Sequence, residues 1–515
     1  MKAKIYEING KNLSIEQIYE IADAKSGEVQ VILTKDAREK ILASRKYVDD
    51  IVKKGEPVYG INTGFGALSD KFIAENELET LQYNLIRSHC TGVGQPFSRL
   101  VTRAIMLLRA NCLASGFSGV SIECIELLLD FINHDINPVV PEKGSVGASG
   151  DLAPLSHIAL CLIGEGEVTY EGKVVRSQFA IDQINKTPVI LKAKDGLALI
   201  NGTAVMAALG SLAIYEAKRI VKIADIATAM TLEAVRGTKR AYDYDISLLK
   251  PHPGQLAASS NLTKLLEGES EISSSHLDCG KVQDPYSLRC VPQVHGAIRQ
   301  TLKHAEEVLN YELNSVTDNP LIFIQKDKVV SGGNFHGEAI ALAMDYLAMG
   351  LSELANIAER RVEKMMNPSF SDLPAFLIKE SGLNSGLMIA HVTMAALASE
   401  NKYLCHPASI DSIPTSTDKE DHVSMGVTSG RKLHEVLKNV KQCLAIEFLC
   451  NTQGIYLLRP LKSNTALEEV YSLIRKHVQP IDKDRVFSTD IENILKLVSN
   501  FEILNVVEKE IGQLK

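Results

Sequence analysis

The chain has 515 residues, of which 45% are apolar and 23% charged, and its formal net charge is −8. This is the composition of an ordinary globular protein, and a negative charge without dense Lys/Arg runs argues against a nucleic-acid or anionic-membrane surface. Nine cysteines, an odd number without a C-x-x-C pair, favour reduced thiols in a reducing, cytoplasmic compartment over a disulfide framework or a zinc site.

The N-terminal region contains a predicted strand, a helix and a glycine-rich loop. Alternating apolar residues predict a strand over Val29–Thr34, and a helical period predicts a helix over Lys35–Lys54 that ends at Gly55. The loop Tyr59–Gly66 follows, and its three glycines can adopt positive φ or let another backbone come close. We therefore expect this loop to lie against another part of the chain.

Helices dominate the remainder, and sheet is minor. Two short hairpins are predicted over Val168–Val175 and Leu321–Val330, each with turn residues at its centre. Apolar periodicity predicts helices over Arg99–Ser115, Ser121–Asn133, Thr203–Arg236, Val294–Asn314, Gly337–Met366, Asn384–Lys402 and Gly430–Asn451, and a helical terminal stretch over Ile491–Val507.

These elements predict a mainly α fold, with a long central helical bundle and a smaller mixed N-terminal region. We place the mixed region at residues 1–200, the central bundle at 201–470 and a C-terminal helical segment at 471–515. The uncharged segment Gly196–Tyr215 has the length of a membrane span, but Asn201, Thr203 and Ser211 within it favour a buried helix. The N-terminal residues have no apolar stretch long enough for a signal peptide, so neither export nor a membrane location is expected.

The most informative segment is Gly144–Pro154, which reads Gly-Ser-Val-Gly-Ala-Ser-Gly-Asp-Leu-Ala-Pro. A glycine-rich loop before a helix would account for its Gly and Ser content, but does not need Ala-Ser-Gly in that order. A phosphate-binding loop would need Lys-Ser/Thr after Gly150, and a serine-hydrolase elbow would need Gly where Asp151 stands. Neither of these two motifs is present.

The order Ala148-Ser149-Gly150 suits an autocatalytic ring closure. The amide nitrogen of Gly150 attacks the carbonyl carbon of Ala148, and loss of one water from the ring and one from Ser149 leaves an exocyclic methylidene. Glycine lets the backbone bend tightly, serine supplies the β-hydroxyl that is lost, and alanine leaves the attacked carbonyl uncrowded. The product would be 5-methylidene-imidazol-4-one (MIO), an electrophile that needs no external cofactor.

The segment Gly147–Ser156 resembles the signature of the aromatic amino acid ammonia-lyases. The resemblance covers nearly the whole chain, and the similar segments occur in the same order along the chain as in that family. Further similar segments are Tyr59–Gly66, Asn84–Gly94, Leu197–Thr203, Gln283–Gln293, Thr317–Pro320, Gly332–Glu338, Asn384–Ala390 and His406–Met425. The resemblance implies a homotetramer whose active sites are assembled from more than one subunit.

Roles for individual residues follow from the same resemblance. Tyr59 matches the position of the base that removes the β-proton, and Arg289 matches the arginine that binds the substrate carboxylate with its planar fork. Asn201, Gln283 and Tyr286 match positions around the electrophile and the amino group. Phe335 matches an aromatic wall over the reaction centre.

The substrate is inferred from three further positions. His89 excludes the apolar pair typical of phenylalanine-specific relatives but is shared with tyrosine-specific ones, whereas Met388 and Glu420 match a pocket for L-histidine. A carboxylate can accept an imidazole N–H, while a phenyl ring would leave it buried and unpaired. We therefore expect elimination of ammonia from L-histidine to give trans-urocanate, with tyrosine as an alternative substrate and an aminomutase as an alternative reaction.

Two other hypotheses are less favoured. His336, Glu338, His406 and His422 are available ligands, but none forms a recognised spacing, so no catalytic metal is expected. A non-catalytic helical binding protein would have lost residues such as Ser149, Tyr59 or Arg289, and all of these are present.

Overall fold

The computed structural model describes residues 3–64, 66–68, 70–277 and 282–515. Its contacts separate into two compact units that are discontinuous in the chain: unit 1 comprises Met1–Tyr215, Ala305–Asp345 and Pro407–Arg431, and unit 2 comprises Glu216–His304, Tyr346–His406 and Lys432–Lys515. The boundaries predicted near residues 200 and 470 divide the chain into continuous segments and stay a prediction.

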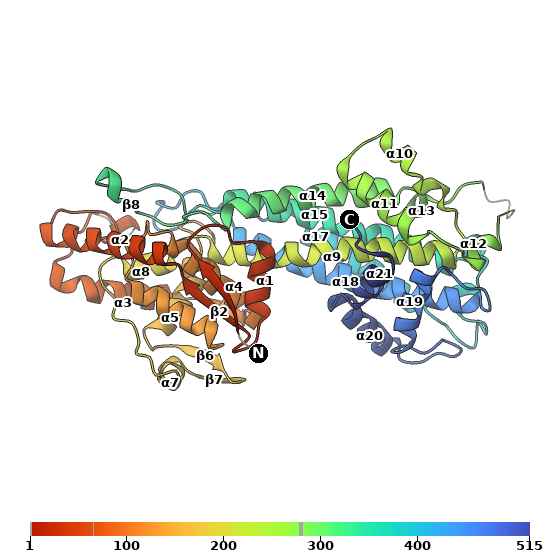
Figure 1. Ribbon diagram of the computed structural model, residues 1–515, viewed down its shortest axis with the longest axis horizontal. Helices are drawn as coiled ribbons and strands as arrows, with labels where there is room; N and C mark the ends of the chain where they lie inside the picture. The colour runs from red at the N-terminus through yellow and green to blue at the C-terminus, as the bar shows by residue number, and fades with distance from the viewer. Residues whose placement is uncertain (1–2, 65, 69, 278–281) are drawn as a thin grey trace. The chain divides into compact units, whose positions relative to one another are not determined.

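The mainly α fold is confirmed, and helices make up most of both units (Figure 1). The helices of unit 1 are α1 (Ile15–Asp23), α2 (Lys35–Lys54), α3 (Leu78–His89), α4 (Arg99–Ala114), α5 (Ile122–Asn133), α6 (Leu152–Leu162), α7 (Ser177–Gln183) and α8 (Asp195–Ile200). Unit 2 has α10 (Tyr244–Leu248), α11 (Pro253–Leu265), α12 (Glu271–Ser274), α13 (Tyr286–Arg289), α16 (Pro368–Ser371), α17 (Met388–Leu404), α19 (Thr465–Arg475), α20 (Phe487–Ser499) and α21 (Glu502–Ile511). The division between the units falls within α9 (Ala204–Ala234), α14 (Val291–Glu312), α15 (Glu338–Met366) and α18 (Gly426–Leu457).

Sheet is minor, as predicted. The predicted strand β2 (Val29–Leu33) pairs in parallel with β1 (Lys4–Ile8), which the sequence analysis did not predict. Both predicted hairpins are present, as β6 (Glu167–Tyr170) with β7 (Lys173–Arg176) and β8 (Leu321–Phe323) with β9 (Lys328–Val330). The remaining strands are β3 (Val93–Pro96) paired with β5 (Pro141–Lys143), and β4 (Asn137–Pro138) paired with β6.

Local sequence signals explain where the helices begin and end. Helix α2 begins after Thr34, whose hydroxyl accepts from the backbone N–H of Ala37, and ends at Gly55 in the left-handed conformation. Helix α4 is buried on nearly all of its faces and packs against α1 and α5, which places it at the centre of unit 1. A helix of this composition needs neighbours on all sides.

The uncharged segment Gly196–Tyr215 is buried, as predicted, but it forms two helices instead of one. Helix α8 ends at Ile200, and α9 begins at Ala204. Between them Gly202 has φ of 134°, and a Cβ atom there would lie 2.1 Å from the Thr317 carbonyl oxygen. The close approach of this second backbone breaks the helix, and periodicity could not reveal it.

Among the described residues, one helix, α15, is long and apolar enough to span a membrane by length and composition, and 61% of its most apolar window is buried inside the protein. The eight cysteines in the described ranges are free thiols, and Cys279 lies outside those ranges.

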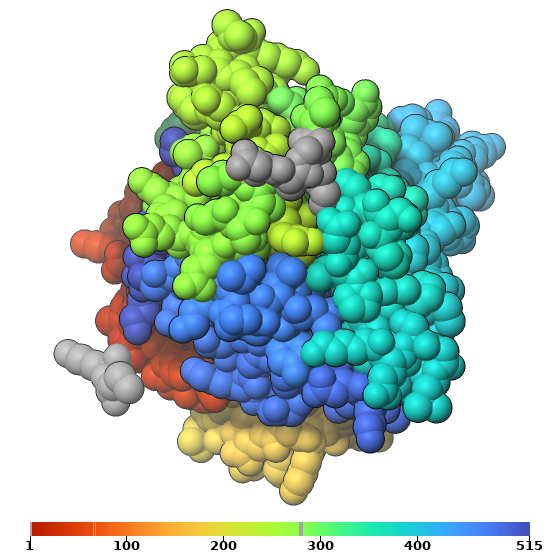
Figure 2. Space-filling model, turned by 90° about the vertical axis from the view of Figure 1, so that its right-hand side faces the viewer, coloured from red at the N-terminus to blue at the C-terminus, as the bar shows by residue number. Residues whose placement is uncertain are grey.

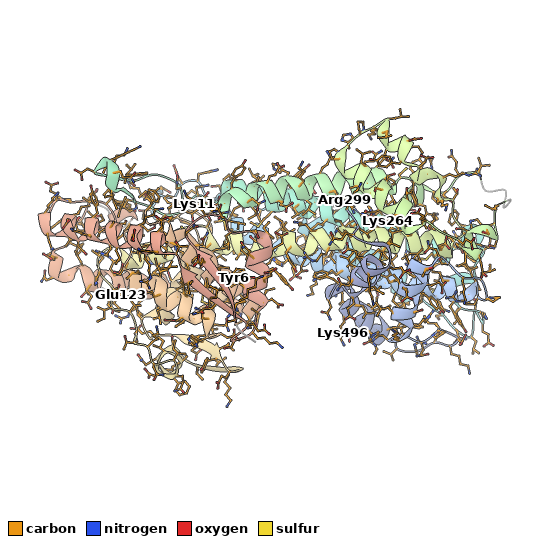
Figure 3. All side chains as sticks on the ribbon, in the orientation of Figure 1. Tyr6, Lys11, Glu123, Lys264, Arg299 and Lys496 are labelled. Carbon is orange, nitrogen blue, oxygen red and sulfur yellow. The ribbon has the colours of Figure 1, made fainter. Side chains whose placement is uncertain are left out.

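Unit 2 holds the C-terminal residues by hydrogen bonds. The backbone N–H of Lys515 donates to Asn261 Oδ1 at 2.7 Å. Lys264, which is labelled in Figure 3, donates from Nζ to the Gln513 carbonyl at 3.1 Å. Within unit 2, segments distant in sequence, coloured green, turquoise and blue, share one face (Figure 2). The terminal helical stretch predicted over Ile491–Val507 is interrupted: Phe501 has a positive φ of 58° between α20 and α21.

Candidate functional site

The Ala148-Ser149-Gly150 segment is held against the break between α8 and α9. Gly150 and Gly202 form a parallel bridge, and the Asp151 backbone N–H donates to the Gly202 carbonyl at 2.8 Å. Gly150 has φ of 77°, and a Cβ atom on it would lie 2.2 Å from the Gly202 carbonyl oxygen. No residue other than glycine fits this position, because both the conformation and the contact exclude a side chain.

A second segment of unit 1 holds the loop from its other end. Gly147 has φ of 70°, and its carbonyl accepts from the Ser424 hydroxyl at 3.1 Å. The Met425 backbone N–H donates to the Val146 carbonyl at 2.8 Å. The loop is therefore fixed on both sides of Ala148 and Ser149 by residues distant in sequence.

Asp151 follows the Ala-Ser-Gly triplet and caps a helix that is distant in sequence. Helix α6 begins after Asp151, but the side chain does not cap α6. Its Oδ2 instead accepts from the backbone N–H groups of Val205 and Met206 at 2.9 and 3.0 Å, and its Oδ1 accepts from the Ser145 hydroxyl. Asp151 thus caps α9 and joins the Ala148-Ser149-Gly150 loop to it. Complete burial raises the pKa of this carboxyl to about 7, against the opposing effect of these hydrogen bonds.

Glu420 lies directly at Ser149. The Ser149 hydroxyl donates to Glu420 Oε1 at 2.8 Å, and the hydroxyls of Thr415 and Ser416 each donate to Oε2 at 2.7 Å. Burial opposes ionisation of Glu420, but the three hydroxyl donors outweigh it and lower the pKa below its usual value. Glu420 is therefore an ionised acceptor at neutral pH, adjacent to the side chain that ring closure would consume.

His89 shares this part of unit 1. It is the last residue of α3, and its Nδ1 lies 3.1 Å from the Ser88 hydroxyl. Burial lowers the pKa of His89, while the Leu85 carbonyl and the nearby charge of Glu420 oppose that shift. A lowered pKa keeps the ring neutral at pH 7, so it can exchange hydrogen bonds as donor or acceptor.

Asn201, Tyr59 and Phe335 belong to the same unit. Asn201 ends α8 next to Gly202, and its buried Oδ1 has no hydrogen-bond partner. Tyr59 is half-buried, and the adjacent Gly60 packs so closely that a Cβ atom would lie 2.7 Å from Pro320 Cδ. The Tyr59–Gly66 loop thus lies against another part of the chain at Gly60, as predicted, although the atoms nearest to Gly60 belong to side chains and not to backbone. Phe65 lies outside the described residues. Phe335 is half-buried, in the turn before α15.

The other four predicted residues belong to unit 2. Gln283 is exposed, and Tyr286 and Arg289 begin and end α13. The guanidinium of Arg289 lies 4.4 Å from the ring centroid of Tyr286, and the buried Nε of Arg289 has no hydrogen-bond partner. Tyr286 is 70% exposed. Met388, half-buried, begins α17. The structure therefore collects the predicted residues into two groups, one in each unit.

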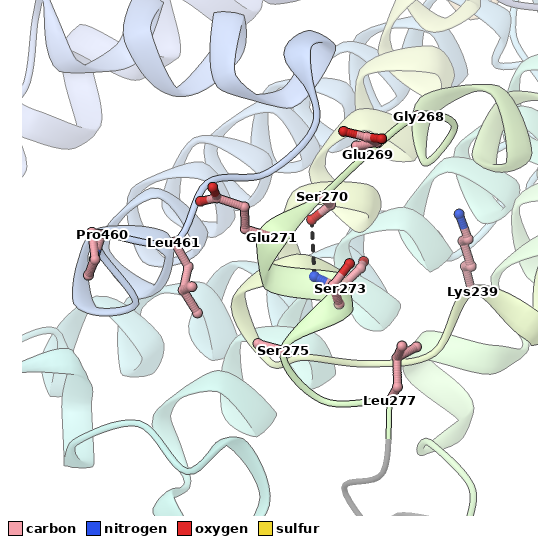
Figure 4. A pocket seen from close by; sticks show the side chains of 11 residues that line it. Lys239, Gly268, Glu269, Ser270, Glu271, Ser273, Ser275, Leu277, Pro460 and Leu461 are labelled. Carbon is pink, nitrogen blue, oxygen red and sulfur yellow. Dashed lines mark hydrogen bonds between the residues drawn. The ribbon is translucent and has the colours of Figure 1, made fainter.

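A cavity of unit 2 contains none of these residues. It has a volume of about 910 Å³ and is lined by segments 268–275 and 460–461 with Lys239 and Leu277 (Figure 4). Its polar groups are mainly serine hydroxyls, of which Ser270 and Ser273 donate to Glu233. The residues for which the sequence predicts chemistry therefore lie outside this cavity.

The sequence analysis missed the residues that support the site. Thr415 and Ser416 orient Glu420, Ser424 holds Gly147, and Asp151 caps α9. Asp151 adjoins the Ala-Ser-Gly triplet, so its position gave a signal, whereas the hydroxyl residues have none beyond their proximity to Glu420 in the chain.

Comparisons with known proteins agree with this geometry. Residues 13–476 match the family model described as aromatic amino acid lyase. The histidine ammonia-lyase of Caldanaerobacter subterraneus subsp. tengcongensis is 49% identical over 503 residues, which cover 98% of each chain. The crystal structure of histidine ammonia-lyase from Trypanosoma cruzi superimposes with a TM-score of 0.91 at 44% identity, covering 98% of this chain and 95% of that one. The tyrosine aminomutase of Streptomyces globisporus gives a TM-score of 0.93 at 36% identity over 99% of each chain. The chain therefore belongs to the aromatic amino acid lyase family, whose members cleave a carbon–nitrogen bond.

Proposed function

We propose that this protein eliminates ammonia from L-histidine to give trans-urocanate, with an MIO group made from Ala148, Ser149 and Gly150. The observation that carries the proposal is the ionised carboxylate of Glu420, which lies 2.8 Å from the Ser149 hydroxyl and close enough to His89 to affect its pKa. Apolar substrate rings would leave that charge unpaired, at a large desolvation cost.

The residues of the loop fit ring closure. Within the described residues, the Gly150 amide nitrogen donates no hydrogen bond, so it is not held away from the Ala148 carbonyl. The Ser149 hydroxyl that must leave as water already donates to Glu420. When formed, MIO supplies the electrophilic carbon at which the substrate is activated.

Loss of the Ser149 hydroxyl would change what Glu420 can bind. Oε1 would lose its only hydroxyl donor, while Oε2 would keep its two donors from Thr415 and Ser416. The ring N–H of histidine can then donate to Oε1 in a charge-assisted hydrogen bond. Ring closure would thereby create the acceptor that selects the substrate.

The remaining side chains supply binding and proton transfer. We infer that Tyr59 removes the β-proton, and that Arg289 holds both oxygens of the carboxylate through its planar fork. Asn201 Oδ1, buried and without a partner, can accept from the substrate amino group. Gln283 and Tyr286 would orient the leaving nitrogen, with Phe335 and Met388 covering the imidazole.

The proposal includes a homotetramer, and a cytoplasmic location agrees with the free thiols. The residues assigned to the electrophile and to the substrate ring are mostly in unit 1, whereas Arg289, Tyr286 and Gln283 are in unit 2. A tetramer in which active sites are shared between subunits gives both groups a function.

The test is a comparison of substrates on protein whose intact mass is known. We expect the purified chain to weigh two waters less than its sequence, and to release urocanate from L-histidine much faster than it releases products from L-tyrosine or L-phenylalanine. An unmodified mass in active protein would contradict the MIO assignment. A preference for tyrosine, or recovery of a β-amino acid, would favour the tyrosine lyase or the aminomutase instead.

A further inference from the structure

A second cluster of ligand-type side chains lies beside the Glu420 segment, in unit 1. His336 and Glu338 stand at the start of α15, and His422 is 86 residues beyond His336. One potential ligand atom from each of the three lies within 4.8 Å of those of the other two. The two imidazole rings are parallel, with centroids 5.7 Å apart. Sequence spacing could not reveal this set, because the fold brings its members together.

One oxygen of the carboxylate in this cluster lacks a hydrogen-bond donor among the described residues, although the side chain as a whole is 32% exposed. Glu338 Oε2 is buried and has no hydrogen-bond partner, and His422 Nε2 lies 4.0 Å from it, beyond hydrogen-bonding distance. A buried carboxylate oxygen without a donor is costly, and a cation removes that cost. The group therefore points to a positively charged ligand.

Hydrogen bonding also sets the ring of His336 in the form that a metal requires. Its Nε2–H can donate to the His422 carbonyl at 3.2 Å, which makes Nδ1 the nitrogen that carries the lone pair. That lone pair accepts a hydrogen bond of 3.3 Å from the Glu338 backbone N–H, which a bound metal ion would replace. A histidine that binds a metal through one nitrogen commonly donates its other N–H to a backbone carbonyl.

We propose that His336, Glu338 and His422 bind one divalent transition-metal ion. Two imidazoles and one carboxylate suit Zn²⁺, Mn²⁺ or Fe²⁺ better than Mg²⁺ or Ca²⁺, which prefer oxygen ligands alone. Bonds of about 2.0–2.2 Å require the ligand atoms to approach one another more closely than they do here. His422 can supply that movement, because its side chain is 69% exposed.

The ion would act on the loop and not on the chemical step. His422 is two residues from Glu420 on one side and two from Ser424 on the other, and Ser424 holds the Gly147 carbonyl. A bond from His422 to the start of α15 would therefore fix the segment that orients Glu420. The site is separate from the electrophile, and binding of the ion does not depend on the proposed reaction.

The experiment measures Zn²⁺ binding by the full-length protein after treatment with a chelator. Competition with a chromophoric zinc indicator gives the affinity, and Co²⁺ substitution gives a visible spectrum that reports coordination. We expect one ion per chain, with Kd raised at least tenfold in both His422→Ala and Glu338→Gln. His406→Ala, which removes an exposed histidine of unit 2, is the matched control and should bind as the wild type does.

A rise in thermal midpoint with Zn²⁺ provides a second readout, since a ligand that binds only the folded state stabilises it. This rise should shrink in the two cluster variants and persist in His406→Ala. Glu338→Gln is nearly isosteric, so it keeps the test valid if His422→Ala does not fold. The proposal is overturned if the wild type binds no Zn²⁺ below about 1 mM, a free energy of about −4 kcal/mol, or if both cluster variants bind as the wild type does.

Discussion

Glu420 is the residue on which the proposed choice of substrate depends. Its carboxylate accepts three hydroxyl hydrogen bonds, and only the one from Ser149 would be lost when the electrophile forms. The two hydroxyls that remain hold Oε2 and so keep the orientation of the freed Oε1. Thr415 and Ser416 would thus position the carboxylate, and loss of the Ser149 hydroxyl would make Oε1 available to the substrate.

Replacement of Glu420 by Gln should lower histidine turnover more than it lowers stability. A hydrogen bond to a charged acceptor contributes about 1.5–3 kcal/mol, so kcat/KM should fall by about 10- to 150-fold. Glu79→Gln, an exposed substitution on α3, is the control. Equal losses of kcat/KM in the two variants would remove Glu420 from the substrate site.

Substitutions of Tyr59 and Arg289 should affect kcat and KM differently. Tyr59→Phe removes a proton acceptor but keeps the ring, so kcat should fall by at least about 100-fold with little change in KM. Arg289→Lys replaces a bidentate fork by a point charge, so KM should rise as well. Steady-state kinetics on L-histidine distinguish the two outcomes, and small, similar effects from both would contradict these roles.

At the scale of elements, the capping of α9 by Asp151 connects the electrophile loop to a long helix. The first backbone N–H groups of a helix need acceptors, and here the carboxylate of Asp151, at the start of α6, supplies one. The arrangement places a buried charge next to the loop, at a cost that appears as the raised pKa of Asp151.

The pH dependence of stability should reveal this charge. The folded pKa of Asp151 is raised to about 7 from 3.8, so between these values the unfolded chain releases the proton and the folded chain retains it. Stability should therefore fall as pH rises from 4 to 7, by up to about 1.4 kcal/mol for each pKa unit. In Asp151→Asn that contribution is absent, and the difference in unfolding free energy between variant and wild type should change with pH across this window. A pH-independent difference would show that Asp151 keeps an ordinary pKa.

Sequence periodicity predicted the bounds of a helix correctly where residues at its two ends determine them. Helix α2 has the predicted bounds because Thr34 and Gly55 are strong end signals. The break at Gly202 and the positive φ of Phe501 depend on tertiary packing, so the sequence predicted continuous helices there. The Ser149 loop was recognised from its residue order, whereas its partners Ser424 and Gly202 could be found only in three dimensions.

At the scale of the whole molecule, the predicted site residues are divided between the two units. This division allows a test of whether each active site combines residues from different subunits. Ser149→Ala and Arg289→Ala should each be nearly inactive while keeping their helical content. If each active site combines Ser149 of one chain with Arg289 of another, co-expression of both variants should restore about a quarter of wild-type activity through mixed tetramers. Mixing after purification without subunit exchange is the control.

No recovery in co-expressed tetramers shown to contain both variants would place Ser149 and Arg289 of each site in the same chain.

The contact between Ser149 and Glu420 also affects when, during synthesis of the chain, the proposed ring closure can be completed. The two residues are 271 positions apart, and Ser424 follows Glu420. At about 5–20 residues per second, a ribosome needs roughly 14–54 s after it has made Ser149 before it makes Glu420. During that interval the nascent loop lacks both the acceptor of its serine hydroxyl and the clamp on Gly147. Completion of the electrophile should therefore lag behind translation, and incomplete chains should carry an unreacted serine.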